Sequence, residues 1–378
     1  MKYMDEYRDA ALAQVLAHRI AREAQGPRRY RLMEFCGGHT HAISRYGISD
    51  LLPDNVDMIH GPGCPVCVLP VGRIDNAIEL ATQYGLTLCT YADTLRVPAS
   101  GRTSLMQAKA RGADIRMVYS VADALRLAQE HPLRETVFFA IGFETTAPST
   151  ALALRAAERL GLANFSVFCN HVLTPPAMAE ILASPQAHGT DGGIDGVIGP
   201  GHVSCVIGSR PYEAVAETYR RPVVIAGFEP LDLMQTVLML LRQIKQNRHE
   251  VENEYTRALT REGNARAQEL MAEVFELRPS FEWRGLGGIA HSAYRIKPRY
   301  QRFDAERRYG IACRRAADNQ ACACGAILRG EKSPRECRVF GTACTPESPL
   351  GACMVSSEGA CAAHYSYGRF REKTAAAA

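Results

Sequence analysis

Apolar and polar positions along this chain predict strands and helices in alternation. Short apolar runs such as RLMEF (31–35), VDMIH (56–60) and TVFFAIG (136–142) have the length and composition of buried strands. Between them, GRIDNAIELATQYG (72–85) and VADALRLAQEH (121–131) place apolar residues at helical spacing. This alternation predicts parallel sheets with helices on their faces, because parallel strands are joined by crossover helices.

A second series of the same kind follows residue 135. FSVFCNH (165–171), IDGVIGPG (194–201) and PVVIAGFEP (222–230) are strand-like runs separated by helical stretches. AIGFETTAP and IAGFEPLDL look alike, since each is a strand followed by Gly-Phe-Glu and the start of a helix. We therefore expect two Rossmann-like α/β lobes with parallel sheets, the first over residues 31–134 and the second over residues 135–229.

The pattern changes after residue 230. Residues 231–275 read as long polar-faced helices, and RPSFEWRGLGGIAHSAYRI (278–296) looks irregular. Cysteine, proline and glycine then dominate, with too few apolar residues for an ordinary core. We expect residues 230–378 to form a third, mostly helical and irregular domain that folds around a metal centre.

Composition and charge exclude several classes of function. The net charge is +4 over 378 residues, and Lys and Arg are dispersed, so nothing indicates nucleic-acid binding. The N-terminal stretch lacks the uninterrupted apolar core of a signal peptide, and no apolar run reaches membrane-spanning length. We expect a cytoplasmic protein, in which thirteen cysteines indicate metal or redox chemistry rather than disulfides.

The cysteines near the C-terminus predict a metal centre. Cys324, Cys337, Cys344 and Cys361 are separated by 12, 6 and 16 residues. Four thiolates can hold a [4Fe–4S] cluster or Zn²⁺. Zinc sites usually show paired C-x₂₋₄-C knuckles, which this tail lacks, so the spread thiols favour an iron–sulfur cluster over zinc. Cys322 and Cys353 are left over as alternative ligands, inert thiols or a redox-active pair beside the cluster.

A second motif, HGPGCPVCVLP (60–70), carries Cys64 and Cys67 between a strand and a helix. A helix N-terminus presents unpaired N–H groups, which favour the thiolate form of cysteine. The spacing is that of a thioredoxin-like redox pair. It is also that of half a zinc site, but a partner C-x-x-C is absent, so we favour the redox pair.

A third motif, CGGHTH, places Cys36, His39 and His41 after the strand 31–35. Cys and His suit iron or zinc, and α/β proteins place their sites at the carboxyl ends of strands. In isolation, the motif would be a cysteine in a turn with hydrogen-bonding histidines. Because GPGCPVC lies at what looks like the next strand end, we expect Cys36 and the cysteines of GPGCPVC to face one cleft.

Polar residues also follow three further strands. Glu144, Thr145 and Thr146 lie in GFETTAP, His202 lies in GPGHVSCVIG, and Asp93 lies in YADTLRVP. We expect these side chains to line the cleft between the lobes. Thr145 and Thr146 could also simply cap a helix. No Walker A or HExxH sequence is present, so phosphate-loop and zincin functions have no support.

Together, CGGHTH, GPGCPVCVLP, GFETT, PGHVSCVIG and the spaced tail ending in CMVSSEGAC resemble the HypD family of [NiFe]-hydrogenase maturation proteins. The resemblance spans residues 33–367. It implies two α/β lobes and a cluster-bearing third domain on which the N-terminal helix, within residues 1–30, packs. It also implies a [4Fe–4S] cluster on Cys324, Cys337, Cys344 and Cys361.

The resemblance further implies a scaffold on which the Fe(CN)2CO group of the hydrogenase is assembled as transient cargo. Its iron would lie between Cys36 and a cysteine of a HypC-type small chaperone. Cyanide would come from a HypE-type partner, and the hydrogenase large subunit would be an indirect partner.

We expect His39 to hydrogen-bond or ligate the iron. As a hypothesis, the cluster feeds electrons to Cys64 and Cys67, directly or through Cys322 and Cys353. Two other functions stay open: an iron–sulfur thiol–disulfide oxidoreductase and a zinc-stabilised binding protein.

Overall fold

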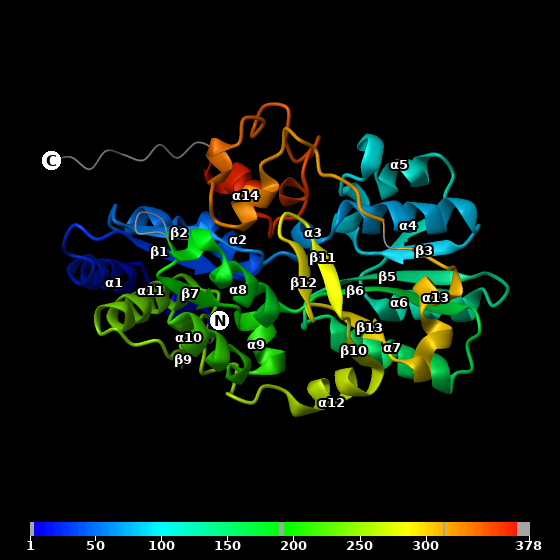
Figure 1. Cartoon of the computed structure of the whole chain (residues 1–378), viewed down its shortest axis with the longest axis horizontal. Coiled ribbons are helices and arrows are strands. Elements are labelled where there is room, and N and C mark those ends of the chain that lie inside the picture. The colour runs from blue at the N-terminus through cyan, green and yellow to red at the C-terminus, as the bar shows by residue number, and fades with distance from the viewer. Residues whose placement is uncertain (1–3, 189–192, 313, 369–378) are drawn as a thin grey trace.

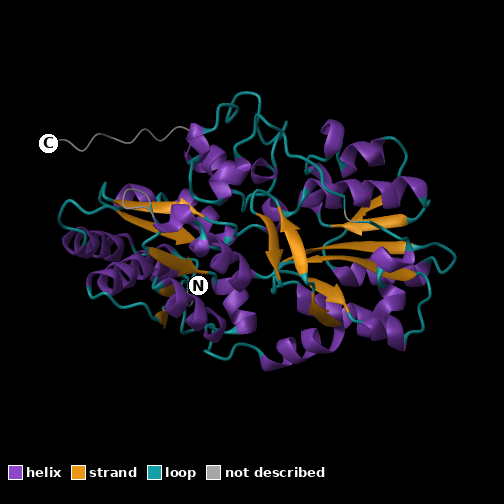
Figure 2. Cartoon of the chain, viewed as in Figure 1, coloured by secondary structure: helices purple, strands orange, loops and turns teal. Residues whose placement is uncertain are grey.

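The computed structural model describes residues 4–188, 193–312 and 314–368, and it contains two α/β lobes side by side (Figures 1 and 2). Both sheets are parallel throughout, which confirms the expected fold class. Lobe A is built on a sheet of order β2-β1-β7-β8-β9, with β1 Tyr30–Glu34, β2 Val56–His60, β7 Gly196–Gly199, β8 Val223–Ile225 and β9 Val251–Asn253. Lobe B is built on a sheet of order β4-β3-β5-β6, with β3 Thr87–Thr90, β4 Ile115–Met117, β5 Thr136–Gly142 and β6 Phe165–His171.

The two lobes are not consecutive in the sequence. The chain begins lobe A with β1 and β2, builds all of lobe B from β3 to β6, and then returns to lobe A with β7 to β9. The strand pairing therefore departs from the expected division at residue 134/135, because β5 pairs with β3 and β7 pairs with β1. Periodicity locates strands, but it carries no information about which strands pair.

Lobe A is covered by helices on both faces of its sheet (Figure 2). Side chains alternate between these faces, so that Leu32 of β1 packs with one set of helices and Met33 with the other. The first set is α1 Ala10–Glu23, α2 Gly37–Tyr46 and α11 Pro230–Lys245, and the second includes α8 Thr174–Ala183 and α10 Glu213–Tyr219. The N-terminal helix α1 packs against α11, so it belongs with lobe A rather than with the cysteine-rich tail.

Lobe B follows the same rule. Phe138 of β5 packs toward one pair of helices, and Phe139 packs toward the other. The first pair is α6 Val121–Glu130 and α7 Ala147–Arg159, and the second is α4 Val71–Gln83 and α5 Leu105–Ala110.

The segment after α11 differs in part from the expectation of long helices followed by irregular chain. It contains the strand β9, the helix α12 Ala265–Val274 and two antiparallel strand pairs. These are β10 Phe275–Leu277 with β13 Tyr294–Ile296, and the hairpin of β11 Ser280–Trp283 with β12 Gly287–Ala290. Gly285 and Gly287 have φ of +77° and +83°, which allows the tight hairpin turn, and Trp283 anchors β11 in the core.

The cysteine-rich tail packs across the junction of the two lobes (Figure 1). Its regular elements are short: α14 Cys324–Leu328 and α15 Ala360–Ala363. Three other short helices are α3 Pro65–Val68, α9 Gly201–Ile207 and α13 Ala305–Arg308. In the described ranges, no helix combines the length and the apolar character that a bilayer crossing needs.

Candidate functional site

The parallel sheet of each lobe has one switch point, which is the position where the chain connections on either side run in opposite directions along the sheet. In lobe A this point lies between β1 and β7, which Cys36 and His202 follow. In lobe B it lies between β3 and β5, which Asp93 and the pair Thr145 and Thr146 follow. Open α/β sheets bind their ligands in the crevices at such switch points.

Both switch points open onto one cavity of about 620 Å³ between the lobes. Its lining includes five of the side chains that the sequence suggested, namely Cys36, Asp93, Thr145, Thr146 and His202. The tail contributes Glu358 to the same wall, so the cavity is shared by lobe A, lobe B and the cysteine-rich segment. We call it the central cavity.

Cys36 presents a sulfur atom at the switch point of lobe A. It is the N-cap residue of α2, and its Sγ lies 3.9 Å from His202 Nδ1. Burial raises the pKa of the Cys36 thiol to about 12, and the nearby carboxylate of Glu358 adds to the effect. The thiol is therefore protonated at neutral pH, and a cation bound at Sγ would displace that proton.

Glu34 holds the backbone of Cys36 in place, and nothing in the sequence indicated this role. Its fully buried carboxylate accepts hydrogen bonds from the backbone N–H of Cys36 at 2.9 Å and from the hydroxyl of Thr40. The same carboxylate lies 2.9 Å from His60 Nδ1. Glu34 thus ties the turn after β1 to the end of β2 and holds the position of Cys36.

The two histidines of interest have different positions. His202 lines the central cavity, and its ring stacks on Phe228 with 3.8 Å between centroids. Loss of hydration lowers the pKa of His202. His39 is fully buried behind this layer, with Nε2 3.1 Å from the carbonyl oxygen of Ala226. Burial lowers the pKa of His39 to about 4, so the ring is neutral at physiological pH. His39 is not part of the cavity lining.

Thr146 and Glu144 both make contacts at the start of a helix. Thr146 is the N-cap residue of α7, and its hydroxyl lies 3.4 Å from His171 Nδ1. Glu144 lies outside the cavity lining, where its buried carboxyl accepts the backbone N–H of Thr174 at 2.9 Å at the start of α8. Burial raises the pKa of Glu144 to about 7.

The raised pKa of Glu144 predicts a pH-dependent stability. The unfolded chain ionises this carboxyl near pH 4.5, whereas the folded chain keeps it protonated until about pH 7. The folded state therefore loses stability as the pH rises through this window, by up to about 3 kcal/mol. We expect Glu144→Gln to remove this loss, so that urea unfolding gives a larger stability gain over the wild type at pH 8 than at pH 5. The exposed Glu217→Gln is the control, and an equal gain at both pH values would contradict the assignment.

The loops that carry CGGHTH and GPGCPVC are in direct contact. The N–H of Gly37 donates to the carbonyl oxygen of Gly63 at 2.9 Å. A Cβ on Gly63 would lie 2.4 Å from the Cys36 nitrogen, and one on Gly37 would lie 2.5 Å from Glu358 Cβ. These glycines are needed because the two loops and the tail approach one another more closely than side chains allow.

Cys64 and Cys67 do not line the central cavity, contrary to the expectation that all three early cysteines face one cleft. Gly63, Pro65 and Val66 form its wall, and the two cysteines are buried behind them. Cys64 is the N-cap residue of α3, and its Sγ accepts the N–H of Cys67 at 3.3 Å. Burial raises the pKa of Cys67 well above its ordinary value.

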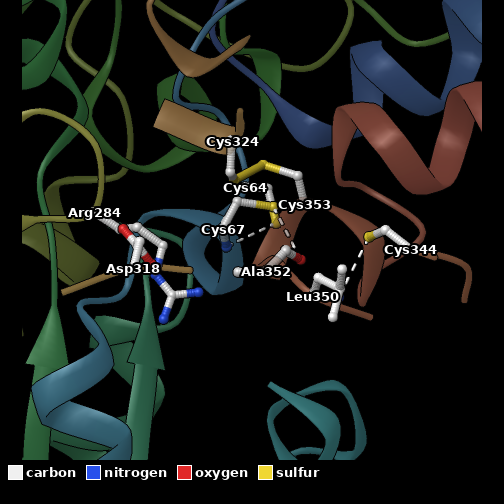
Figure 3. Close-up of a disulfide and its surroundings, with 9 residues drawn as sticks. All are labelled: Cys64, Cys67, Arg284, Asp318, Cys324, Cys344, Leu350, Ala352 and Cys353. Atoms are coloured by element: carbon white, nitrogen blue, oxygen red, sulfur yellow. Dashed lines mark hydrogen bonds and ion pairs between the residues drawn. A yellow bond between two sulfur atoms is a disulfide. The ribbon is translucent and has the colours of Figure 1, made fainter. Parts of the chain in front are cut away.

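Cys67 faces the cysteine-rich tail. Its Sγ lies 3.9 Å from the carbonyl oxygen of Ala352, the residue before Cys353. Figure 3 shows Cys64 and Cys67 beside a disulfide between Cys324 and Cys353. The Cα atoms of this disulfide are 6.2 Å apart, within the usual range.

The disulfide includes one cysteine that was expected to be a cluster ligand. Cys324 was expected to be a ligand, and Cys322 and Cys353 were left open as alternative ligands, inert thiols or a redox pair, but Cys324 bonds to Cys353. Cys322 is a free thiol that packs so tightly on Gly351 that a Cβ there would lie 2.3 Å from its sulfur. The four free thiols of the tail are therefore Cys322, Cys337, Cys344 and Cys361, within the described residues.

These thiols have the character of cluster ligands. They line one small cavity together with Cys324 and Cys353, and the N–H of Leu350 donates to the sulfur of Cys344 at 3.3 Å. Burial and the three neighbouring thiols raise the pKa of Cys361 well above its ordinary value. No three His, Cys, Asp or Glu side chains of the described chain meet at one point as a single metal ion would need. Sulfurs placed around a cavity fit the separate corners of a [4Fe–4S] cluster better than a zinc ion.

Glu358 is the second functional candidate that sequence reasoning missed. It lines the central cavity, and burial together with Asp93 and Glu34 raises its pKa. It lies three residues before Cys361 in the motif VSSEGAC, and this adjacency to an expected ligand cysteine was the available signal.

Comparison with known proteins gives a consistent result. A family model described as "HypD: Hydrogenase formation hypA family" matches residues 11–368. A hydrogenase maturation factor HypD of Cupriavidus necator is 63% identical over 374 residues, which is 98% of each chain. That of Azotobacter vinelandii is 62% identical over 378 residues, all of both chains. That of Escherichia coli is 48% identical over 372 residues, which is 97% of this chain and 98% of its own.

Proposed function

This chain belongs to the HypD family of hydrogenase maturation factors, and from that premise we propose that it is the scaffold on which the hydrogenase iron acquires its cyanide and carbon monoxide ligands. The observation that carries the proposal is the central cavity, which joins Cys36 to polar residues of both lobes and of the tail. The cavity of about 620 Å³ can hold an iron atom with several diatomic ligands.

Cys36 is the proposed protein ligand of the iron cargo. A thiolate is a strong donor to Fe(II), and the protonated Cys36 thiol would release its proton on binding. One thiolate leaves the remaining coordination positions open for cyanide, carbon monoxide and a partner. The cysteine of a HypC-type small chaperone would fill one of these positions from the open side of the cavity, and a HypE-type partner would bring cyanide to the same side.

The polar lining would position the diatomic ligands. Hydrogen-bond donors to the terminal nitrogen of bound cyanide are available from the hydroxyl of Thr145 and, in one tautomer, from the ring of His202. His39 acts through Phe228, on which the rings of both His39 and His202 pack. His39 is thus proposed as a positioning residue rather than an iron ligand.

The four free thiols of the tail are the proposed ligands of a [4Fe–4S] cluster: Cys322, Cys337, Cys344 and Cys361. When bound, such a cluster supplies one-electron transfer. The chain itself holds the thiols in a buried group, and the N–H of Leu350 hydrogen-bonds the sulfur of Cys344.

A thiol–disulfide exchange between Cys64–Cys67 and Cys324–Cys353 is proposed as the accompanying redox step. In the exchange, one S–S bond breaks at one pair as another forms at the other, and two electrons and two protons pass between the pairs. The contact of Cys67 with Ala352, beside Cys353, supports this step. The same contact favours the second candidate function, an iron–sulfur thiol–disulfide oxidoreductase.

Infrared spectroscopy tests the scaffold function. We expect the chain copurified anaerobically with its small partner to show absorption bands of iron-bound cyanide and carbon monoxide. A copurified complex that shows neither band, although its visible spectrum bleaches with dithionite, would contradict the scaffold and leave the oxidoreductase.

A further inference from the structure

A second cavity, of about 540 Å³, lies between lobe B and the cysteine-rich tail and shares no lining residue with the central cavity. Its wall combines residues 96–107 of lobe B, the turn of the β11–β12 hairpin, and parts of the tail at 317–319 and 347–350. The volume is within the range of sites that bind small molecules. We call it the arginine cavity, because the side chains of Arg96, Arg102 and Arg284 line it.

Arg284 is a buried guanidinium with too few acceptors. Its side chain is 1% exposed. Nε lies 3.2 Å from Asp318 Oδ1, but the N–H is not directed at that oxygen, and Nε makes no hydrogen bond within the described chain. Nη2 donates to the carbonyl oxygen of Pro98 over a long 3.4 Å. A buried charge is costly unless its donors are satisfied, so Arg284 has hydrogen-bonding capacity that an anion in the cavity would use.

The other charged groups of the cavity leave it positive. Arg102 is exposed and makes no hydrogen bond or ion pair through its side chain with any residue in the described ranges. The guanidinium of Arg96 donates to the carbonyl oxygens of Pro346 and Val355. The lining holds two carboxylates against these three arginines, those of Glu347 and of Asp318, which is 43% exposed, and Asp75 acts on Arg284 from outside the lining.

We propose that the arginine cavity binds a small anionic molecule through a carboxylate or phosphate group, with Arg284 and Arg102 as its charged contacts. The planar guanidinium fork matches both groups, which can each accept two parallel hydrogen bonds. This proposal stands apart from the proposed function, because it uses neither the iron cargo nor the central cavity.

The position of the cavity connects such a ligand to the thiols. The backbone N–H of Arg284 donates to the carbonyl oxygen of Val68 at 2.8 Å, at the end of the helix that carries Cys67. Leu350 lines the cavity and donates its N–H to the sulfur of Cys344. Figure 3 shows Arg284 and Asp318 in the same region as Cys64 and Cys67. Hydrogen bonds therefore join the wall of the cavity to the residue that follows Cys67 and to the sulfur of Cys344.

Isothermal titration of the anaerobically purified full chain with inorganic phosphate and with succinate, at constant ionic strength, tests the proposal. We expect one site per chain for at least one of the two anions. Arg284→Met keeps the side-chain volume but removes the charge, and should weaken binding by about 10-fold or more. Arg102→Ala should weaken it several-fold, and Arg159→Met, which removes an exposed arginine on α7 outside the cavity, should leave it unchanged.

Binding of phosphate alone assigns a phosphate-bearing ligand, and binding of succinate alone assigns a carboxylate. If Arg284→Met does not fold, as judged by circular dichroism, the Arg102→Ala result decides. Absence of binding by the wild type, or equal binding by wild type, Arg284→Met and Arg102→Ala, overturns the proposal. If the wild type binds neither anion, and Cys67 is alkylated more slowly in Arg284→Met than in the wild type, the charge of Arg284 instead stabilises the nearby thiolates.

Discussion

Replacing Cys36 with serine is expected to abolish the infrared bands of iron-bound cyanide and carbon monoxide and to reduce hydrogenase maturation to background. The hydroxyl of serine does not ionise in the range in which a thiol does, so the iron would lose its proposed protein ligand. Loss of a residue that merely orients a metal ligand lowers affinity by about 10- to 100-fold. Loss of the ligand itself should therefore lower hydrogenase activity by at least about 100-fold.

The fold should survive Cys36→Ser, because serine has nearly the same volume and its backbone N–H still donates to Glu34. Cys205→Ser is the matched control, since Cys205 lines the same cavity but has no proposed role. The infrared spectrum of each variant copurified with the small partner, together with hydrogenase activity in cells that carry the variant, gives the measurement. Unchanged bands in Cys36→Ser would remove Cys36 as the iron ligand.

Replacing Cys64 with alanine is expected to abolish hydrogenase maturation while the visible absorption of the proposed cluster in the tail stays intact. Cys64 accepts the N–H of Cys67, and without it Cys67 has no partner with which to close a disulfide. The proposed exchange with Cys324–Cys353 would then stop, whereas the four free thiols in the described part of the tail are untouched. Absorption before and after dithionite, measured beside hydrogenase activity, separates the two effects.

Cys89→Ala provides the control for a buried cysteine, because Cys89 lies in the core of lobe B, on β3. It should retain both maturation and absorption, with a modest loss of stability from the missing sulfur. If Cys64→Ala loses its visible absorption, the pair and the cluster do not have separate roles. If it retains full maturation, the redox pair is not required.

Much of the local structure could be predicted from periodicity. The strands β2, β5 and β6 lie where apolar runs of strand length placed them. The hairpin β11–β12 was missed because glycine-rich turns and short strands leave no long apolar run, although Trp283 and Phe281 are buried. The exchange of strands between the lobes was missed because strand order depends on contacts between distant segments.

The residues of the candidate site also fall into those that the sequence indicated and those that only the structure revealed. Cys36, Asp93, Thr145 and His202 were recognisable because each follows an apolar strand, and the ends of parallel strands meet at one edge of a sheet. Glu34 lies within a strand, where an acidic residue usually points to solvent, so its burial under Cys36 gave no local signal. Glu358 comes from the tail and reaches the cavity only through the packing of that tail on both lobes.

By itself, the sequence determined which segments become strands and helices and which residue types are available for soft-metal and thiol chemistry, because these depend on side chains close together along the chain. Only the tertiary structure decided that one cavity unites the switch points of two interleaved lobes, that Cys64 and Cys67 lie behind its wall, and that Cys324 bonds to Cys353 rather than staying a free ligand. The physical reason is that such pairings are set by the order of strands and by close glycine contacts, which join residues hundreds of positions apart.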